Sequence, residues 1–253
     1  MIRLRRRAIA AIATVVCAAA AALCVPAMAQ EMAKEKICQL CHTKDQGASP
    51  AVTANYAETL HAKAQGEGPR YNANEGQPGV GCQVCHGPGS EHVKAATEAK
   101  KDTIKSPAKL ETREARLSLC GHCHGQYEVQ GENVVDPSFL ADYKYGDNIL
   151  DKITLKPMSA EKAKLEQLNE MQDSLHFTSA TGPTCIDCHT GHKDLDPSLP
   201  HQTTDAGNQV CLKCHSPETA DVRHCKATFP ADALCKSCHM PDNRHIIKVA
   251  PAG

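Results

Sequence analysis

The stretch CQVCH, residues 82–86, places two cysteines three positions apart and a histidine directly after the second. The same Cys-x-x-Cys-His pattern occurs six times in the 253-residue chain. Its copies lie at residues 38–42, 82–86, 120–124, 185–189, 211–215 and 235–239. This spacing lets two thiols bond to the vinyl groups of one porphyrin while the adjacent imidazole reaches its iron. The repeated motif therefore predicts six covalently bound haem c groups.

Each motif residue has an expected role in holding a haem. The cysteines that would form the thioether bonds are Cys38, Cys41, Cys82, Cys85, Cys120, Cys123, Cys185, Cys188, Cys211, Cys214, Cys235 and Cys238. The histidines that would be the proximal iron ligands are His42, His86, His124, His189, His215 and His239. We call these six stretches the attachment motifs.

Zinc binding and redox disulfides are the alternative explanations for so many paired cysteines. A structural zinc site would combine two Cys-x-x-Cys knuckles, and a redox-active dithiol would occur once beside a βαβ pattern. Neither requires a histidine after every second cysteine. Because histidine fills only 14 of the 253 positions, its presence in all six copies favours haem over both alternatives.

Residues 1–29 have the pattern of an export signal. Four arginines within residues 3–7 precede an apolar run over residues 8–25, and Ala27-Met28-Ala29 resembles a cleavage site. We therefore expect a cleaved signal peptide, a periplasmic protein and a mature chain that begins at Gln30. Retention of the apolar run as a membrane anchor is the alternative.

The charge balance bears on the kind of partner. Removing the four arginines of residues 1–29 from 28 Lys and Arg leaves 24 against 29 Asp and Glu, a formal charge of −5. This balance argues against nucleic acid as a partner. It favours redox partner proteins that have a basic docking face.

The fold class follows from the scarcity of aromatic side chains. The chain has three Phe, five Tyr and no Trp, too few for an ordinary core of this length. After residue 29, roughly forty residues remain to surround each of six macrocycles. We therefore predict a mainly α protein with extensive irregular loops, in which short helices surround a stack of six haems and there is little or no sheet.

The spacing of the motifs predicts two clusters of three haems. The first would occupy residues 30–128 and the second residues 177–253, with a loop and helix connector at residues 129–176. Within the connector, Gln130 to Lys156 has the Gly and Pro content of an extended surface loop. Apolar residues then recur at helical spacing, which predicts a helix from Ser159 to His176.

Six of the remaining histidines are candidates for the distal face of the irons. An isolated histidine is more often a core or surface residue, but six irons that each need a second strong ligand favour the ligand role. His122 lies inside the third motif and is expected to contact solvent or a propionate. His201 follows Pro200 and is expected to be exposed. The six candidates are His61, His92, His176, His192, His224 and His245.

Several longer segments resemble bacterial multihaem c-type cytochromes, the group that includes the tetrahaem cytochrome of ammonia oxidisers and related nitrite- and hydroxylamine-processing proteins. The segments are CQVCHGPGSEHV at 82–93, SLH at 174–176 followed by CIDCHTGH at 185–192, and CKSCHMP at 235–241, which ends near Arg244-His245. The resemblance spans nearly the whole chain after residue 29. It implies distal ligation by His92, His176, His192 and His245.

One departure from this group bears on function. The resemblance implies a Lys-terminated attachment motif in the members that reduce nitrite, and no Cys-x-x-Cys-Lys occurs here. We therefore favour an electron carrier with mostly bis-histidine haems over an enzyme. Two alternatives stay open: a reductase of nitrogen or sulfur oxyanions with one open haem, and an electron-transfer subunit of a membrane quinone-oxidising or outer-membrane conduit complex.

Cys225 lies outside the attachment motifs, beside His224. A buried thiol, an intermolecular disulfide and a haem ligand are the three interpretations. We favour the inert buried thiol.

Overall fold

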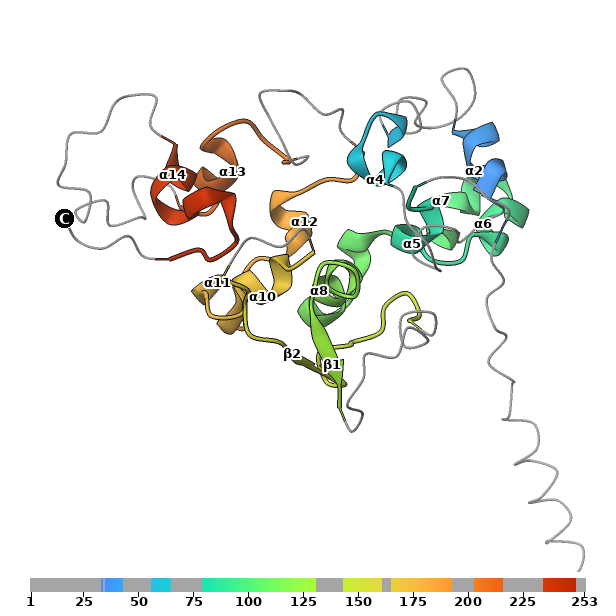
Figure 1. The fold of residues 1–253 in the computed structure, drawn as a ribbon. Helices are drawn as coiled ribbons and strands as arrows, with labels where there is room; N and C mark the ends of the chain where they lie inside the picture. The colour runs from blue at the N-terminus through green and yellow to red at the C-terminus, as the bar shows by residue number, and fades with distance from the viewer. Residues whose placement is uncertain are drawn as a thin grey trace, which may run out of the picture. The chain divides into compact units, whose positions relative to one another are not determined.

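The computed structural model describes residues 33, 35–42, 56–64, 79–130, 143–160, 165–192, 203–215 and 234–248. The chain divides into the units Met1–Glu31 and Met32–Gly253, and every described residue belongs to the second. Short helices joined by irregular segments make up most of this part, together with one two-stranded sheet (Figure 1). The predicted mainly helical, loop-rich fold with little sheet is confirmed. The predicted signal peptide lies outside the described residues, and the division into two three-haem clusters stays a prediction.

The helices are short throughout the described part. The α-helices are α2 (Glu35–Cys41), α4 (Leu60–Lys63), α5 (Cys82–His86), α6 (Ser90–Lys94), α7 (Lys100–Thr103), α8 (Arg113–Gly121), α10 (Gln167–Met171), α11 (Leu175–Thr178), α12 (Cys185–Cys188), α13 (Gln209–Leu212) and α14 (Cys235–His239). The 3₁₀ helices are η1 (Thr97–Ala99), η2 (Pro107–Lys109) and η4 (Pro241–Asn243). In the described residues, no helix is long and apolar enough to cross a membrane.

Every attachment motif begins within a helix, namely α2, α5, α8, α12, α13 and α14. On a helix, residues three and four positions apart lie on the same face. Helical starts therefore direct both cysteines and the following histidine of a motif to one side. This local geometry is what covalent attachment to a single macrocycle requires.

Helix α8 is held by a cap and a small apolar core. The Thr112 hydroxyl caps it by accepting a hydrogen bond from the Ala115 backbone N–H at 3.1 Å. Leu119 packs with Ala115 and Leu110, against Tyr143 and Tyr145. A cluster of this size is consistent with a chain whose aromatic content is low, because few large side chains are available to bury.

A small antiparallel sheet supports a second apolar cluster. Strand β1 (Tyr127–Val129) pairs with strand β2 (Ile153–Leu155), and Tyr127 lies opposite Leu155. Tyr127, Ile149 and Ile153 are buried together. The prediction of a loop from Gln130 to Lys156 is therefore wrong at β2, because the apolar side chains of this strand pack onto Tyr127. Residues 131–142 of that segment lie outside the described part.

The predicted helix from Ser159 to His176 is wrong as a single helix, although α10 and the start of α11 lie within it, and residues 161–164 lie outside the described part. Helices α10 and α11 are separate, because Ser174 has an extended backbone and its hydroxyl caps α11 by accepting from the Phe177 N–H at 3.3 Å. Ser159 caps no helix in the described part, and its backbone N–H instead donates to the Glu166 carboxylate. The polar side chain between α10 and α11 forms a hydrogen bond with the backbone at the start of α11. The chain therefore forms two short helices where the apolar spacing alone predicted one.

Candidate functional site

Five predicted proximal histidines each lie opposite one predicted distal histidine. Each pair joins two segments that are distant in sequence. The pairs, with the distances between ring centroids, are His42 and His92 (6.1 Å), His86 and His192 (5.6 Å), His124 and His61 (5.9 Å), His215 and His176 (5.8 Å), and His189 and His245 (5.9 Å).

These separations fit an iron between the two rings of each pair. Two metal–imidazole bonds of about 2 Å, with the distance from each nitrogen to its ring centre added, place trans imidazoles about 6 Å apart. A direct ring stack in the same chain is much closer, since the centroids of His122 and Tyr143 lie 4.2 Å apart. The residues at each pair thus fit a haem held from both faces.

Burial keeps the ligand candidates in the form that binds metal. The pKa of His61 is lowered by burial and further by the nearby His124 and His189. Burial also lowers the pKa of His176 and His192, with smaller contributions from their partner histidines. A neutral imidazole coordinates iron, whereas an imidazolium cannot, so these shifts favour ligation.

Backbone carbonyls fix the orientation of several rings. The His86 Nδ1 lies 2.9 Å from the Lys105 carbonyl oxygen, and the His92 Nδ1 lies 2.8 Å from that of Lys100. A carbonyl only accepts, so each Nδ1 must carry the proton. The other nitrogen of each ring, Nε2, is then left to coordinate iron.

The sixth attachment motif is described only on its proximal side. The His239 Nδ1 lies 2.8 Å from the Lys248 carbonyl oxygen. Its expected partner, His224, lies outside the described residues, as do His201 and Cys225. Their assigned roles stay predictions.

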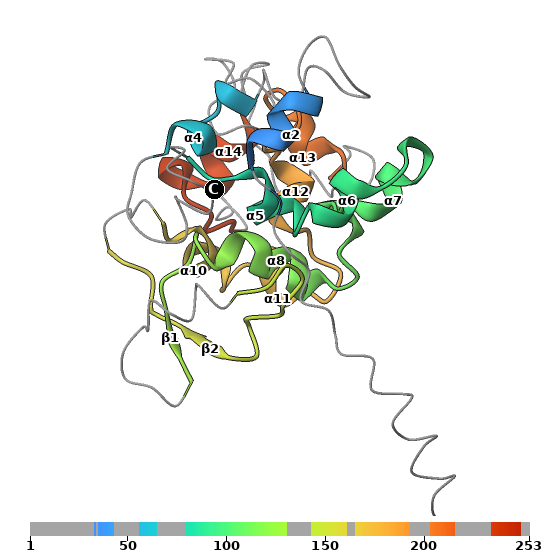
Figure 2. The same ribbon diagram turned by 90° about the vertical axis from the view of Figure 1, so that its right-hand side faces the viewer.

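The first four attachment motifs contact one another in the order of the sequence. Helix α2 contacts α5, and α8 contacts α12 (Figure 2). Between these pairs, Cys85 interacts electrostatically with Cys120. A hydrogen bond joins the Cys120 and Cys185 thiols and raises the pKa of Cys120 while it lowers that of Cys185.

The order continues through the last two motifs. The backbone N–H of Thr204, which precedes the fifth motif, donates to the Cys188 carbonyl at 2.8 Å. Burial raises the pKa of Cys188 to about 11, and the nearby Cys211 of the fifth motif contributes to this rise. Burial raises the pKa of Cys211, and the nearby Cys235 of the sixth motif raises it further. Consecutive motifs are therefore neighbours along the whole series.

Exposed apolar side chains flank several ligand candidates. Leu40 lies within the first motif, Leu60 precedes His61, and Leu175 precedes His176. These leucines are 66%, 56% and 72% exposed. Their positions fit a face that a macrocycle covers.

Arg113 is a positioning residue that sequence reasoning missed. Its Nε donates to the Gly182 carbonyl at 2.8 Å, and its Nη2 donates to the carbonyls of His176 at 2.6 Å and Phe177 at 3.0 Å. The guanidinium also lies over the Phe177 ring, 5.9 Å from its centroid. Arg113 thereby ties the start of α8 to the segment that carries His176. No sequence signal indicated this, because the contacts join segments far apart in the chain.

Glu170 and Arg244 are two further residues that the sequence did not reveal. The Arg244 Nε donates to Glu170 Oε1 at 2.8 Å, and the His245 backbone N–H donates to Glu170 Oε2 at 2.7 Å. Both side chains are largely buried. No sequence signal indicated Glu170, which lies among polar residues between Leu168 and Met171.

His122 is buried, so the expected solvent contact is wrong, while the alternative of a propionate contact stays a prediction. It is only 5% exposed and stacks on Tyr143. Its Nδ1 lies 3.1 Å from the Ser118 carbonyl oxygen, one turn earlier on α8. The end of α8 turns this residue towards Tyr143 in the polypeptide core.

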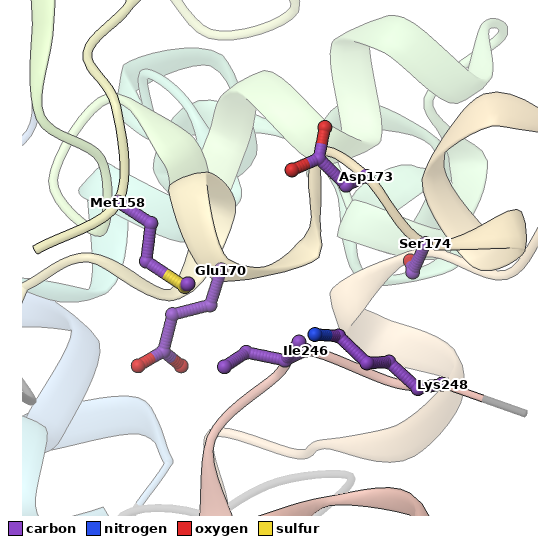
Figure 3. Close-up of a pocket in the computed structure, with 6 residues that line it drawn as sticks. All are labelled: Met158, Glu170, Asp173, Ser174, Ile246 and Lys248. Carbon is purple, nitrogen blue, oxygen red and sulfur yellow. The ribbon is translucent and has the colours of Figure 1, made fainter. Parts of the chain in front are cut away.

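A small cavity lies beside Glu170. Its volume is about 110 Å³, and Figure 3 shows the lining residues, which come from α10 and from the segments after β2, α10 and η4. Small-molecule sites usually have about 300–1,000 Å³. The cavity suits ordered water better than a substrate. The lining residues are Met158, Glu170, Asp173, Ser174, Ile246 and Lys248.

Comparison with known proteins agrees with the motif analysis. The family model for the doubled CXXCH motif matches residues 176–220. The chain is 26% identical over 183 residues to the cytochrome c nitrite reductase subunit NrfA of Nitratidesulfovibrio vulgaris, which covers 59% of this chain and 35% of that protein. The chain thus spans about a third of this relative.

Among solved structures, the chain resembles the undecaheme cytochrome from the S-layer of Carboxydothermus ferrireducens. The identity is 18% and the TM-score is 0.33, over 69% of this chain and 33% of that chain. The repeated attachment motif, the match to the doubled-motif family and the similarity to NrfA together identify the protein as a bacterial multihaem c-type cytochrome.

Proposed function

We propose that this cytochrome is a periplasmic electron carrier that holds six haems c, each between a proximal and a distal histidine. The observation that carries the proposal is the set of five proximal–distal pairs at 5.6–6.1 Å. When bound, haem supplies a one-electron iron couple, and a second histidine closes that iron to substrate. A chain that occupies both faces of its irons is built to pass electrons on.

The arrangement of the attachment motifs supports a route along the sequence. The thiols of Cys120 and Cys185 belong to the third and fourth motifs, and those of Cys211 and Cys235 to the fifth and sixth. Cofactors held by such neighbouring motifs would lie close together. The polypeptide keeps consecutive sites adjacent, so that electrons could enter near the first motif and leave near the sixth, or the reverse.

The partner and location are part of the proposal. The charge of −5 after residue 29 supports docking to a redox protein with a basic face, and the pattern of residues 1–29 supports export. A pull-down with the purified holoprotein, repeated at high salt, tests the electrostatic docking. Partners retained in low salt and released in high salt are expected.

A reductase is the second candidate, because the chain is similar to a protein named as a nitrite reductase subunit. Such an enzyme needs one iron with an open face. The six attachment motifs here all end in histidine, which favours the carrier.

Low-temperature EPR of the oxidised protein, with a carbon monoxide difference spectrum of the reduced protein, separates the two candidates. Both signals are normalised to a haem content measured from the mass of the intact protein. Six low-spin haems and no carbon monoxide binding are expected for the carrier. A high-spin signal from about one haem in six, with matching carbon monoxide uptake, would establish an open site and overturn it.

A further inference from the structure

We propose that Glu170 is a positioning residue for the site formed by His189 and His245, where its carboxylate orients His245 and lowers the reduction potential of the bound iron. The inference rests on the proposed bis-histidine ligation. It adds a specific residue that distinguishes this site from its neighbours.

The carboxylate reaches His245 through one of its oxygens. Oε2 of Glu170 accepts the His245 backbone N–H at 2.7 Å and lies 3.4 Å from the His245 Nδ1. The ring of His245 in turn lies 5.9 Å from that of His189, between centroids. Nδ1 faces the carboxylate, so Nε2 is the nitrogen left for iron. This 3.4 Å contact is electrostatic and is not a hydrogen bond. A carboxylate beside the outer nitrogen favours this ring orientation and raises the basicity of the ring as a ligand.

Other sites use a neutral group at the same place. The Nδ1 atoms of His86 and His92 lie against the carbonyls of Lys105 and Lys100. A carbonyl orients a ring but adds no net charge. The ligand His245 has a carboxylate oxygen beside it that these two sites lack, while the positive charge of Arg244 pairs with the other oxygen of Glu170. A nearby carboxylate oxygen stabilises the ferric form over the ferrous form.

Arg244 holds the other carboxylate oxygen. Its Nε donates to Glu170 Oε1 at 2.8 Å, while its Nη1 and Nη2 donate to the carbonyls of Ala160 at 3.3 Å and Ser159 at 3.0 Å. The guanidinium is thus anchored on the side of Glu170 away from Oε2. Glu170 is only 3% exposed, and a buried charge persists only when it is paired and hydrogen-bonded.

The helix that carries Glu170 is itself fixed. The neighbouring Asn169 amide donates to the carbonyls of Gln126 at 2.6 Å and Lys156 at 2.9 Å, and its Oδ1 accepts the Gln126 N–H at 2.8 Å. These bonds secure α10 to the residues before β1 and after β2, which lie together at one end of the sheet. A carboxylate on such a rigid element is preorganised toward His245.

The test is a potentiometric titration of the holoprotein, followed by EPR, in four variants. In Glu170→Gln, the midpoint potential of one haem should rise. A change of about tenfold in its reduced-to-oxidised ratio is expected, which equals about 59 mV for a one-electron couple. In Arg244→Gln, the midpoint potential of the same haem should fall, because the Glu170 carboxylate then lacks its positively charged partner. Glu128→Gln is the control, an exposed acid on β1 that pairs with Lys156 at 3.8 Å, and should shift nothing. His245→Ala should convert one haem to the high-spin form.

The outcomes separate the inference from the ligation on which it rests. If His245→Ala creates one high-spin haem but Glu170→Gln titrates like the wild type, the role of Glu170 is overturned and the ligation stands. If His245→Ala leaves every haem low-spin, the proposed ligation is overturned, and the inference with it. If Arg244→Gln fails to incorporate haem, the comparison of Glu170→Gln with Glu128→Gln still decides.

Discussion

The imidazole rings of His86 and His192 are parallel, with an interplanar angle of 2° and centroids 5.6 Å apart. One ring belongs to the second attachment motif, and the other follows the fourth. Rings at this separation fit two ligands that would hold one iron between them. The pair therefore ties together two segments that the sequence separates by a whole motif and the connector.

Removal of a distal ring should open one site. We expect His192→Ala to convert one haem in six to a high-spin form that binds carbon monoxide, because no second strong ligand remains on the iron held by His86. EPR and carbon monoxide difference spectra measure the change. His201→Ala is the control, since this residue is assigned no ligand role, and it should leave the spectra unaltered. An unchanged spectrum in His192→Ala would remove this residue from the ligand set.

Ring planes should be visible in the low-spin EPR signals. His42 and His92 are near parallel at 16°, whereas His124 and His61 are near perpendicular at 88°. Parallel imidazoles split the two iron orbitals of π symmetry, while perpendicular imidazoles leave them nearly equal in energy. We expect rhombic signals from the parallel sites and a signal with a large maximal g value from the perpendicular one. Loss of that signal in His61→Ala would assign it, and its persistence would contradict the pairing.

Arg113 should control both stability and the His176 site. Arg113→Ala removes three hydrogen bonds to carbonyls near His176. We expect a loss of about 2–3 kcal/mol in the free energy of unfolding and partial high-spin character at one haem. Denaturant titration and EPR measure these effects.

Arg116 provides the matched control for Arg113 on the same helix. Its Nε donates to one carbonyl, that of Leu110, at 3.0 Å. Arg116→Ala should weaken folding less and leave the haem spectra intact. Equal spectral effects of the two variants would show that Arg113 does not act through His176.

Gly79 should be intolerant of a side chain. Its φ of +93° lies in the left-handed region, and a Cβ there would clash with the Ala62 backbone, with the carbonyl carbon 2.7 Å away. Ala62 follows His61, so Gly79→Ala should disturb the His124 site as well as reduce stability. Thermal unfolding and EPR of the holoprotein measure both. Glu58→Ala, which removes an exposed ion pair with Lys63, should be nearly neutral by comparison.

Helix predictions from the sequence failed where polar capping competed with apolar spacing. Leu168, Met171 and Leu175 recur as on one helix, but the Ser174 cap divides them between α10 and α11. The apolar spacing records which residues are buried or contact an apolar surface. It does not indicate where a helix begins or ends, which depends on the hydrogen bonds that a capping side chain makes with the backbone.

The sequence by itself determined the cofactor chemistry and the class of fold. Haem attachment depends on two thiols and an imidazole at a fixed spacing along the chain, and this spacing can be recognised in the sequence. The scarcity of aromatic residues likewise predicted short helices with little sheet, because few side chains are available to build a core.

Only the tertiary structure decided which histidine lies opposite which motif. His61 faces His124, and His245 faces His189, because the folded chain brings together segments whose separation carries no pairing information. The burial of His122 and the contact of Glu170 with His245 were invisible for the same reason. Covalent attachment depends on residues that are close in sequence, so the motif predicts it. The pairing of histidines and the charges around each pair depend on contacts between segments that are distant in sequence.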